Sequence, residues 1–239
     1  MIDWLLAKIC GETLPADDII HWLFATYGWL IEHEGGVDAF RKNRPLILPT
    51  QENFPIHATA TDGHPLALEV FDYVRQHAHM SSWPCELIQQ ELEPEMTGRQ
   101  AIGTYKRHEN GQVRITYRQD LLSDVPTLIS VLAHELGHYY LSHVKAGQPG
   151  GPKAREYATD VAVTFLGFGI FKANCVYRPN FRIGYLGELP SAYSLAIFTE
   201  LHRLDPGFVI PHLRPNPASY YKECLRDLRK TTRRPALLK

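Results

Sequence analysis

The spacing of apolar residues predicts helices along most of the chain. The segment from Asp17 to His33 repeats apolar side chains every three or four residues, begins with acids and is followed by Gly35-Gly36. Residues 65–80 predict a second helix, in which Pro65 suits the first turn. Further helices are predicted from Ser123 or Asp124 to about Lys145, from about Lys153 onward, and over residues 190–204 and 218–230. The first fifteen residues also predict an amphipathic helix, and their sequence does not resemble a signal peptide.

One short stretch instead alternates apolar and polar residues with the period of a strand. Ile102 and Thr104 precede an Asn110-Gly111 turn, and Val113, Ile115 and Tyr117 follow it. Alternation on both sides of such a turn predicts a β-hairpin. Residues 44–63 carry three prolines and predict an extended connector. The expected fold class is therefore α+β, mainly helical, with a small antiparallel sheet. We expect N-terminal helices and the connector over residues 1–64, packed on a main domain over residues 65–239.

Composition and charge exclude several classes of protein. The chain has 239 residues, of which 44% are hydrophobic and 21% charged, with a net charge of -1. No charge excess points to nucleic acid or an anionic membrane as a partner. The longest apolar run, Val161 to Phe171 between Asp160 and Lys172, is too short to cross a bilayer and predicts a buried helix. The four cysteines form no CxxC pair, which favours free thiols in a reducing cytoplasm.

The candidate chemistry lies in the predicted helix that starts near Asp124. His134 and His138 are four residues apart, so both imidazoles lie on one helix face and could hold one metal ion. Glu135, beside the first histidine, could reach a water on that metal without binding the metal itself. The alternative is three solvated polar side chains. The apolar residues around them favour the metal site, because buried ionisable groups need a partner.

A catalytic metal of this kind needs a third protein ligand. The metzincin pattern requires a histidine at position 144, which is Val144, and His143 would face elsewhere on a continuing helix. The second pattern is a glutamate on the following helix, which Glu156 supplies. Asp160 lies four residues later on the same face and could accept the second N–H of a ligating histidine. An acidic first helical turn would also explain the two acids, but not their spacing after His138.

With HExxH followed by ExxxD, the stretch from Gly103 to Ile170 resembles the gluzincin class of zinc metallopeptidases. The HELGH form and the short gap between the motifs are similar to compact intracellular members such as the ImmA/IrrE-type peptidases. The resemblance implies a zincin-like core with an active-site helix. It implies one zinc ion bound by His134, His138 and Glu156, with Glu135 as general base and Asp160 in support. The implied activity is hydrolysis of peptide bonds in a peptide or protein substrate.

Two other interpretations compete with a peptidase. One is a catalytically silent protein that keeps the zincin fold and binds or regulates, although such a protein would not need Glu135. The other is a DNA-binding regulator that uses the basic C-terminal face formed by Lys222, Arg226, Arg229 or Lys230, and Arg233. A solvated helix end explains that face more simply, and nucleic acid is not expected as a partner. Candidates for an additional oxyanion donor are Tyr185, Tyr193, His202 and His212, of which Tyr185 is preferred because a glycine-flanked loop carries it.

Overall fold

The computed structural model describes residues 13–90, 101–145, 147–178, 181–182 and 184–230. The described part is mainly helical and contains a three-stranded and a two-stranded sheet. Of the helix predicted over the first fifteen residues, residues 1–12 lie outside the described part. The helices are α2 Asp17–Glu34, α3 Val37–Asn43, α4 His64–His77, α5 Val125–Leu141, α6 Arg155–Val163, α7 Gly169–Cys175, α8 Glu188–His202, α9 Pro206–Val209 and α10 Pro215–Arg229. The strands are β1 Glu86–Gln90, β2 Gly103–Arg107, β3 Val113–Arg118, β4 Tyr177–Arg178 and β5 Phe181–Arg182.

The larger sheet is mixed, and the prediction of a purely antiparallel sheet is wrong. The predicted hairpin is present, with Gly103 of β2 opposite Tyr117 of β3 in antiparallel register. On the other side of β3 lies β1, which pairs in parallel, with Glu86 opposite Arg114. The sequence of β1 has too few alternating apolar residues to predict a strand. Its parallel pairing depends on a partner that is distant in the chain.

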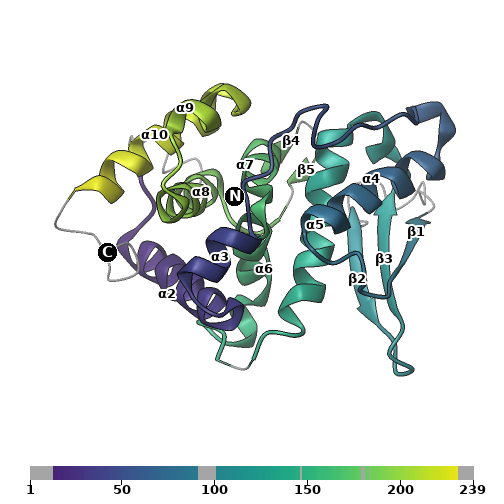
Figure 1. Ribbon diagram of the computed structural model, residues 1–239, viewed down its shortest axis with the longest axis horizontal. Coiled ribbons are helices and arrows are strands. Elements are labelled where there is room, and N and C mark those ends of the chain that lie inside the picture. The colour runs from purple at the N-terminus through teal and green to yellow at the C-terminus, as the bar shows by residue number, and fades with distance from the viewer. Residues whose placement is uncertain (1–12, 91–100, 146, 179–180, 183, 231–239) are drawn as a thin grey trace.

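Helix α5 lies between the three-stranded sheet and helices α6, α7 and α8, and α4 packs on the sheet side of α5 (Figure 1). Asp124 caps its N-terminus by accepting a hydrogen bond from the Thr127 amide at 3.2 Å, as the predicted helix start requires. The helix ends at Leu141, four residues before the predicted end, because a tighter turn follows in which the His143 amide bonds to the Tyr140 carbonyl. Most side chains of α5 are buried, so this helix forms the centre of the core.

The single helix predicted beyond Lys153 is divided into three parts. Helix α6 ends at Val163, a wide π-type turn spans Thr164–Phe168, and α7 begins at Gly169. Gly167 has φ 100°, a conformation that other residues rarely adopt. Its carbonyl accepts a hydrogen bond from the Ile47 amide at 3.0 Å, so the extended connector runs against this turn. All residues of the apolar run are buried, which confirms a buried segment but not a continuous helix.

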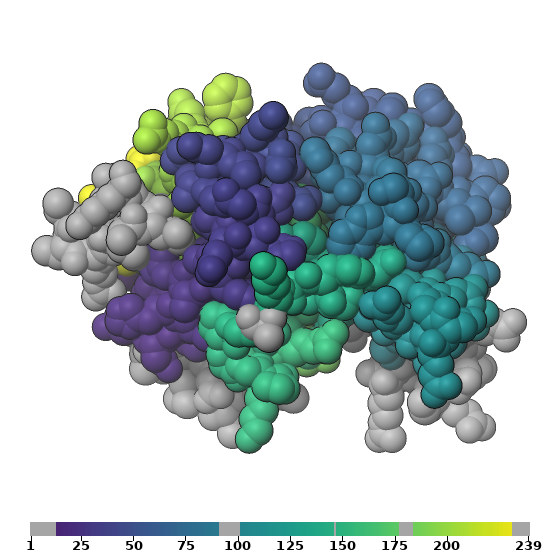
Figure 2. Space-filling view, turned by 60° about the horizontal axis from the view of Figure 1, so that its bottom comes forward, coloured from purple at the N-terminus to yellow at the C-terminus, as the bar shows by residue number. Residues whose placement is uncertain are grey.

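The N-terminal region packs against the rest of the molecule through polar contacts as well as through shared apolar core. The Arg44 guanidinium donates to the Ala78 carbonyl at 2.7 Å and to Glu34 at 3.1 Å. The Tyr140 hydroxyl of α5 donates to the same glutamate at 3.1 Å. In a space-filling view, α2 and α3, the segment before α6 and the β2–β3 hairpin share one face (Figure 2). Over the described ranges, we find no helix with the length and hydropathy needed to span a membrane.

The connector and the π-type turn predict a large effect of substituting Gly167 with alanine. A Cβ at this position would overlap the Pro45 carbonyl oxygen, and the backbone conformation itself disfavours any side chain. Gly36 has a similar φ, 107°, but a Cβ there would meet nothing within 4 Å. We expect Gly36→Ala to lower the free energy of unfolding by about 1–3 kcal/mol. We expect Gly167→Ala to lower the free energy of unfolding by about 1–3 kcal/mol more than Gly36→Ala does, because of the overlap.

Urea unfolding followed by circular dichroism measures both losses. Equal losses in the two variants would show that the connector does not press on the turn as described.

Candidate metal centre

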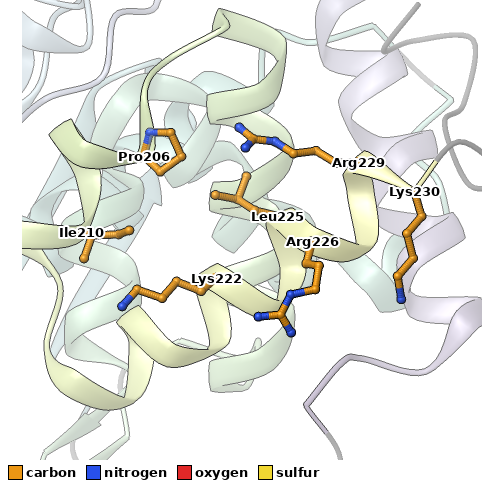
Figure 3. Close-up of a pocket in the computed structure, with 7 residues that line it drawn as sticks. All are labelled: Pro206, Ile210, Lys222, Leu225, Arg226, Arg229 and Lys230. Carbon is orange, nitrogen blue, oxygen red and sulfur yellow. The ribbon is translucent and has the colours of Figure 1, made fainter.

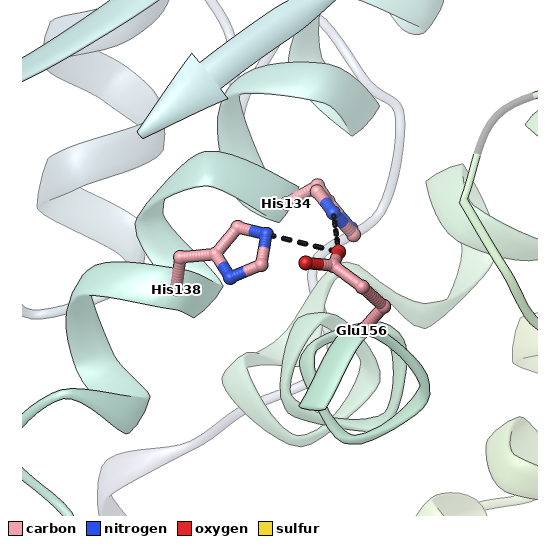
Figure 4. A group of neighbouring side chains, drawn as sticks. All are labelled: His134, His138 and Glu156. Atoms are coloured by element: carbon pink, nitrogen blue, oxygen red, sulfur yellow. Dashed lines mark ion pairs between the residues drawn. The ribbon is translucent and has the colours of Figure 1, made fainter. Parts of the chain in front are cut away.

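His134 and His138 of α5 converge with Glu156 of α6 (Figure 4). The Glu156 Oε2 atom lies 3.2 Å from His138 Nε2 and 3.6 Å from His134 Nε2. One ligand atom from each of the three residues lies within 4.8 Å of the others. Within the described part of the chain, this is the one such group of three or more metal-ligating side chains. These are the three residues that the sequence spacing predicts as metal ligands.

Close packing of α5 on α6 lets Glu156 reach the two histidines. A Cβ at Gly137 would lie 3.1 Å from Thr159 Cγ2 and 3.4 Å from the Thr159 carbonyl oxygen. A side chain at Gly137 would therefore be in tight contact with Thr159, so the two helices are closely packed at this glycine. Glycine in a helix interior costs about 1 kcal/mol relative to alanine, and here it permits the close contact. The group that approaches this glycine is the neighbouring helix.

Hydrogen bonds at Nδ1 orient both imidazoles. His134 Nδ1 lies 3.0 Å from Asp160 Oδ1, a carboxylate oxygen that can only accept. His138 Nδ1 lies 3.2 Å from the Thr159 hydroxyl oxygen, and that hydroxyl donates its own hydrogen to the Arg155 carbonyl at 3.0 Å. Both Nδ1 atoms therefore act as donors. Neutral imidazoles in these tautomers turn their Nε2 lone pairs toward Glu156, as a metal site requires.

Asp160 is fully buried and is satisfied on both oxygens. Its Oδ1 atom also pairs with the ammonium of Lys172, at 2.7 Å, and the lysine side chain is 2% exposed. Its Oδ2 atom accepts hydrogen bonds from the backbone amides of Tyr185, at 2.6 Å, and Leu186, at 2.7 Å. Burial disfavours the charged carboxylate, but Lys172 and His134 outweigh it and hold the Asp160 pKa well below its usual range. The carboxylate is thus a permanent negative charge beside His134.

The local charges favour a bound cation. The carboxylates of Glu156 and Asp160 act on both histidines and that of Glu135 acts on His134, while Lys172 is the buried basic partner of Asp160. Without metal, burial opposes protonation of His134. The bonds to Asp160 and Glu156 prevail and raise its pKa to about 9. Burial and the charge of His134 lower the His138 pKa to about 4, so the metal-free site favours a positive charge on His134 and a neutral His138.

Glu135 lies apart from the three converging ligand atoms and is 5% exposed. Strand β2 covers it, since a Cβ at Gly103 would lie 2.9 Å from Glu135 Oε1. Burial raises the pKa of Glu135 to about 7, although the nearby His134 charge lowers it. A carboxyl group with this pKa can both accept and release a proton near neutral pH.

Of the four candidate oxyanion donors, the structure places only Tyr185 in ring contact with a histidine of the metal-ligating group. The ring of Tyr185 lies parallel to that of His134, with centroids 6.5 Å apart and an interplanar angle of 20°. Tyr193 is buried in α8 and donates to Asp227 at 2.9 Å, and His202 stacks on Phe198 with centroids 4.2 Å apart. His143 packs on Trp83, with ring centroids 4.5 Å apart, and is not part of the converging group. His212 belongs to a short 3-10 turn after α9, where its carbonyl accepts from Asn174.

Sequence reasoning missed two residues that support the histidines. Thr159 gives no signal, because a threonine between Ala158 and Asp160 looks like any helix position. Lys172 gives a weak one, as a lone lysine next to a long apolar run. In the sequence, Lys172 and Asp160 only bracket that run. The bent path through the π-type turn instead joins the two as a buried ion pair.

The basic C-terminal face borders a separate pocket of about 400 Å³ (Figure 3). The pocket is lined by Pro206, Ile210, Lys222, Leu225, Arg226, Arg229 and Lys230, none of which belongs to the metal-ligating group. Two of its cations are paired within the chain, Arg226 with Glu223 and Arg229 with Glu200. The fifth residue predicted for this face, Arg233, lies outside the described residues.

No family model, curated protein or solved structure matches the chain. The resemblance to gluzincins therefore rests on the two motifs and on the side-chain arrangement described above.

The buried pair predicts that Lys172→Met is strongly destabilising. The substitution leaves the Asp160 carboxylate in the interior without its ammonium partner, and breaking a buried pair in this way costs about 3–5 kcal/mol. We expect the additional change Asp160→Asn to recover at least about 1 kcal/mol of that loss, because a neutral amide then replaces the buried carboxylate that has lost its ammonium partner. Urea unfolding of the metal-free protein measures both values. A double variant less stable than Lys172→Met would contradict the pairing.

Proposed function

We propose that the protein is a zinc-dependent metallopeptidase. The observation that carries the proposal is the convergence of His134, His138 and Glu156 with both Nδ1 atoms held by acceptors. This donor set, two imidazoles and one carboxylate, is one that catalytic zinc sites use, and it leaves a coordination position for water or substrate. We further propose that the helices and hairpin around it form a zincin-like core of the gluzincin type.

In this proposal the three side chains hold one zinc ion. Bound zinc supplies Lewis-acid chemistry and an acidified water at neutral pH. Asp160 keeps His134 in the required tautomer and increases its basicity, and Thr159 orients His138. Lys172 holds one oxygen of Asp160, and two backbone amides hold the other. Together these contacts keep Asp160 from moving toward the metal.

Glu135 is the proposed general base. It is adjacent to His134 in the chain and lies outside the group of three ligand atoms. Burial raises its pKa to about 7, so it can take a proton from the attacking water and release it to the leaving amine. A site that only bound metal would not need a further carboxyl group that lies outside the ligand set. This feature favours a peptidase over the alternative of a catalytically silent, zincin-like binding protein.

We propose a cytoplasmic location, with a peptide or protein as substrate. Among the described cysteines, Cys85 and Cys224 are free thiols, which is compatible with a reducing compartment.

The metal site predicts a sharp difference among the histidines of α5 and the turn that follows it. We expect His134→Ala, His138→Ala and Glu156→Ala each to weaken zinc binding by more than about 100-fold, since each removes a ligand. His143→Ala is the matched control, because this nearby histidine packs on Trp83, and it should leave zinc affinity unchanged. Competition with a fluorescent chelator measures the affinities. Wild-type affinity in Glu156→Ala, or an equal loss in the control, would refute this ligand set.

The proposed base predicts that zinc binding and turnover separate in Glu135→Gln. The amide has nearly the shape of the acid but cannot accept the proton, so we expect kcat to fall about 10²–10⁴-fold. Zinc affinity should change little, because Glu135 is not a proposed ligand. A library of internally quenched peptides serves as substrate, with the wild-type protein at equal zinc content as reference. Zinc binding without hydrolysis of any peptide by the wild type would favour the silent binding protein.

A further inference from the structure

Two exposed tyrosines next to the metal-ligating group form a distinct aromatic surface. Among the described residues, four large hydrophobic side chains are exposed: Leu68 43%, Tyr157 44%, Tyr185 50% and Phe208 66%. Single exposed side chains of this type are common and need no explanation. Two of the four, however, contact each other. The rings of Tyr157 and Tyr185 meet edge to face, with centroids 6.1 Å apart and an interplanar angle of 72°.

This pair borders the proposed zinc ligands on the side of His134. Tyr157 directly follows Glu156 in α6, and the Tyr185 ring lies parallel to the His134 ring at 6.5 Å. On the side of His138, the ring of Tyr105 from β2 is also nearly parallel, at 6.1 Å. Tyr105 is half-buried against Tyr139, with ring centroids 5.7 Å apart. The more exposed aromatic surface is therefore the one beside His134.

The backbone holds Tyr185 in this position. Its amide donates to Asp160 Oδ2 at 2.6 Å, and the following amide, of Leu186, donates to the same oxygen at 2.7 Å. Gly184 has φ 75°, and a Cβ there would overlap Lys172 Nζ and lie 2.5 Å from Asp160 Oδ1. The chain thus lies directly on the buried ion pair. A ring presented by such a fixed loop loses little conformational freedom when it binds a ligand.

We propose that Tyr157 and Tyr185 form a binding subsite for a large apolar side chain, preferably aromatic, of the peptide substrate. The inference rests on the proposed function, because that function places the scissile bond at the three ligands. Two tyrosine rings in edge-to-face contact offer an apolar surface with polar rims, which suits another aromatic ring. The nearby carboxylates do not favour a cationic side chain instead. Glu156 faces the two histidines, and Asp160 is buried and paired with Lys172.

Binding of two hydroxamates to the zinc-loaded full-length protein tests the subsite without any need for turnover. N-acetyl-phenylalanine hydroxamate and N-acetyl-alanine hydroxamate share the zinc-binding group and differ in the side chain. We expect wild-type protein to bind the phenylalanine compound about tenfold more tightly in calorimetry, from added apolar and aromatic contact. Tyr157→Ala/Tyr185→Ala should reduce the preference to less than about twofold. Binding of the alanine compound should stay within about threefold of wild type.

Two control variants separate the ring from other effects. Tyr157→Phe/Tyr185→Phe keeps both rings and should keep the preference. Phe208→Ala removes an exposed aromatic of α9, a helix that Figure 1 shows apart from α5 and α6, and should also keep the preference. A thermal melt of each zinc-loaded variant checks the fold.

The outcomes distinguish failure of the subsite from failure of the proposed function. Equal binding of the two compounds to the wild type, or a preference that persists in the double alanine variant, overturns the subsite while the zinc site stands. No binding of either compound to zinc-loaded protein overturns the accessible catalytic metal and the subsite with it.

Discussion

A single buried carboxylate, that of Asp160, organises the candidate site. It receives hydrogen bonds or an ion pair from four groups: His134 of α5, Lys172 of α7, and the amides of Tyr185 and Leu186 before α8. An isolated charge in this position would be very unfavourable, so all four groups must stay in place for the charge to be tolerated. The requirement joins three helices and a loop at one point. That point lies directly behind the histidine proposed to bind zinc.

Two glycines make this arrangement sterically possible. Gly137 allows α5 and α6 to approach closely enough for Glu156 to reach both histidines. Gly184, with its positive φ, allows the loop that carries Tyr185 to lie on the ion pair. A methyl group at Gly184 would overlap the ion pair, and one at Gly137 would be in tight contact with Thr159 of α6.

Local sequence predicted the elements whose signals are local. Helix α2, helix α5 with its Asp124 cap and the β2–β3 hairpin follow from periodicity and turn residues. Strand β1 could not be predicted, because it is stabilised by pairing with a distant strand. The break between α6 and α7, in the helix predicted from about Lys153 onward, could not be predicted for a related reason. The Gly167 conformation is stabilised by contact with the connector near Ile47, which periodicity does not report.

The residues of the candidate site divide in the same way. The spacing of His134, Glu135 and His138 by itself determined that two imidazoles share a helix face beside a carboxylate, because helix geometry is fixed by the backbone. The spacing of Glu156 and Asp160 did the same for the following helix. Only the tertiary structure decided that Glu156 meets both histidines and that Lys172 and the Tyr185 loop close on Asp160. Those contacts depend on how the helices cross and where the chain bends, and packing between distant segments determines both.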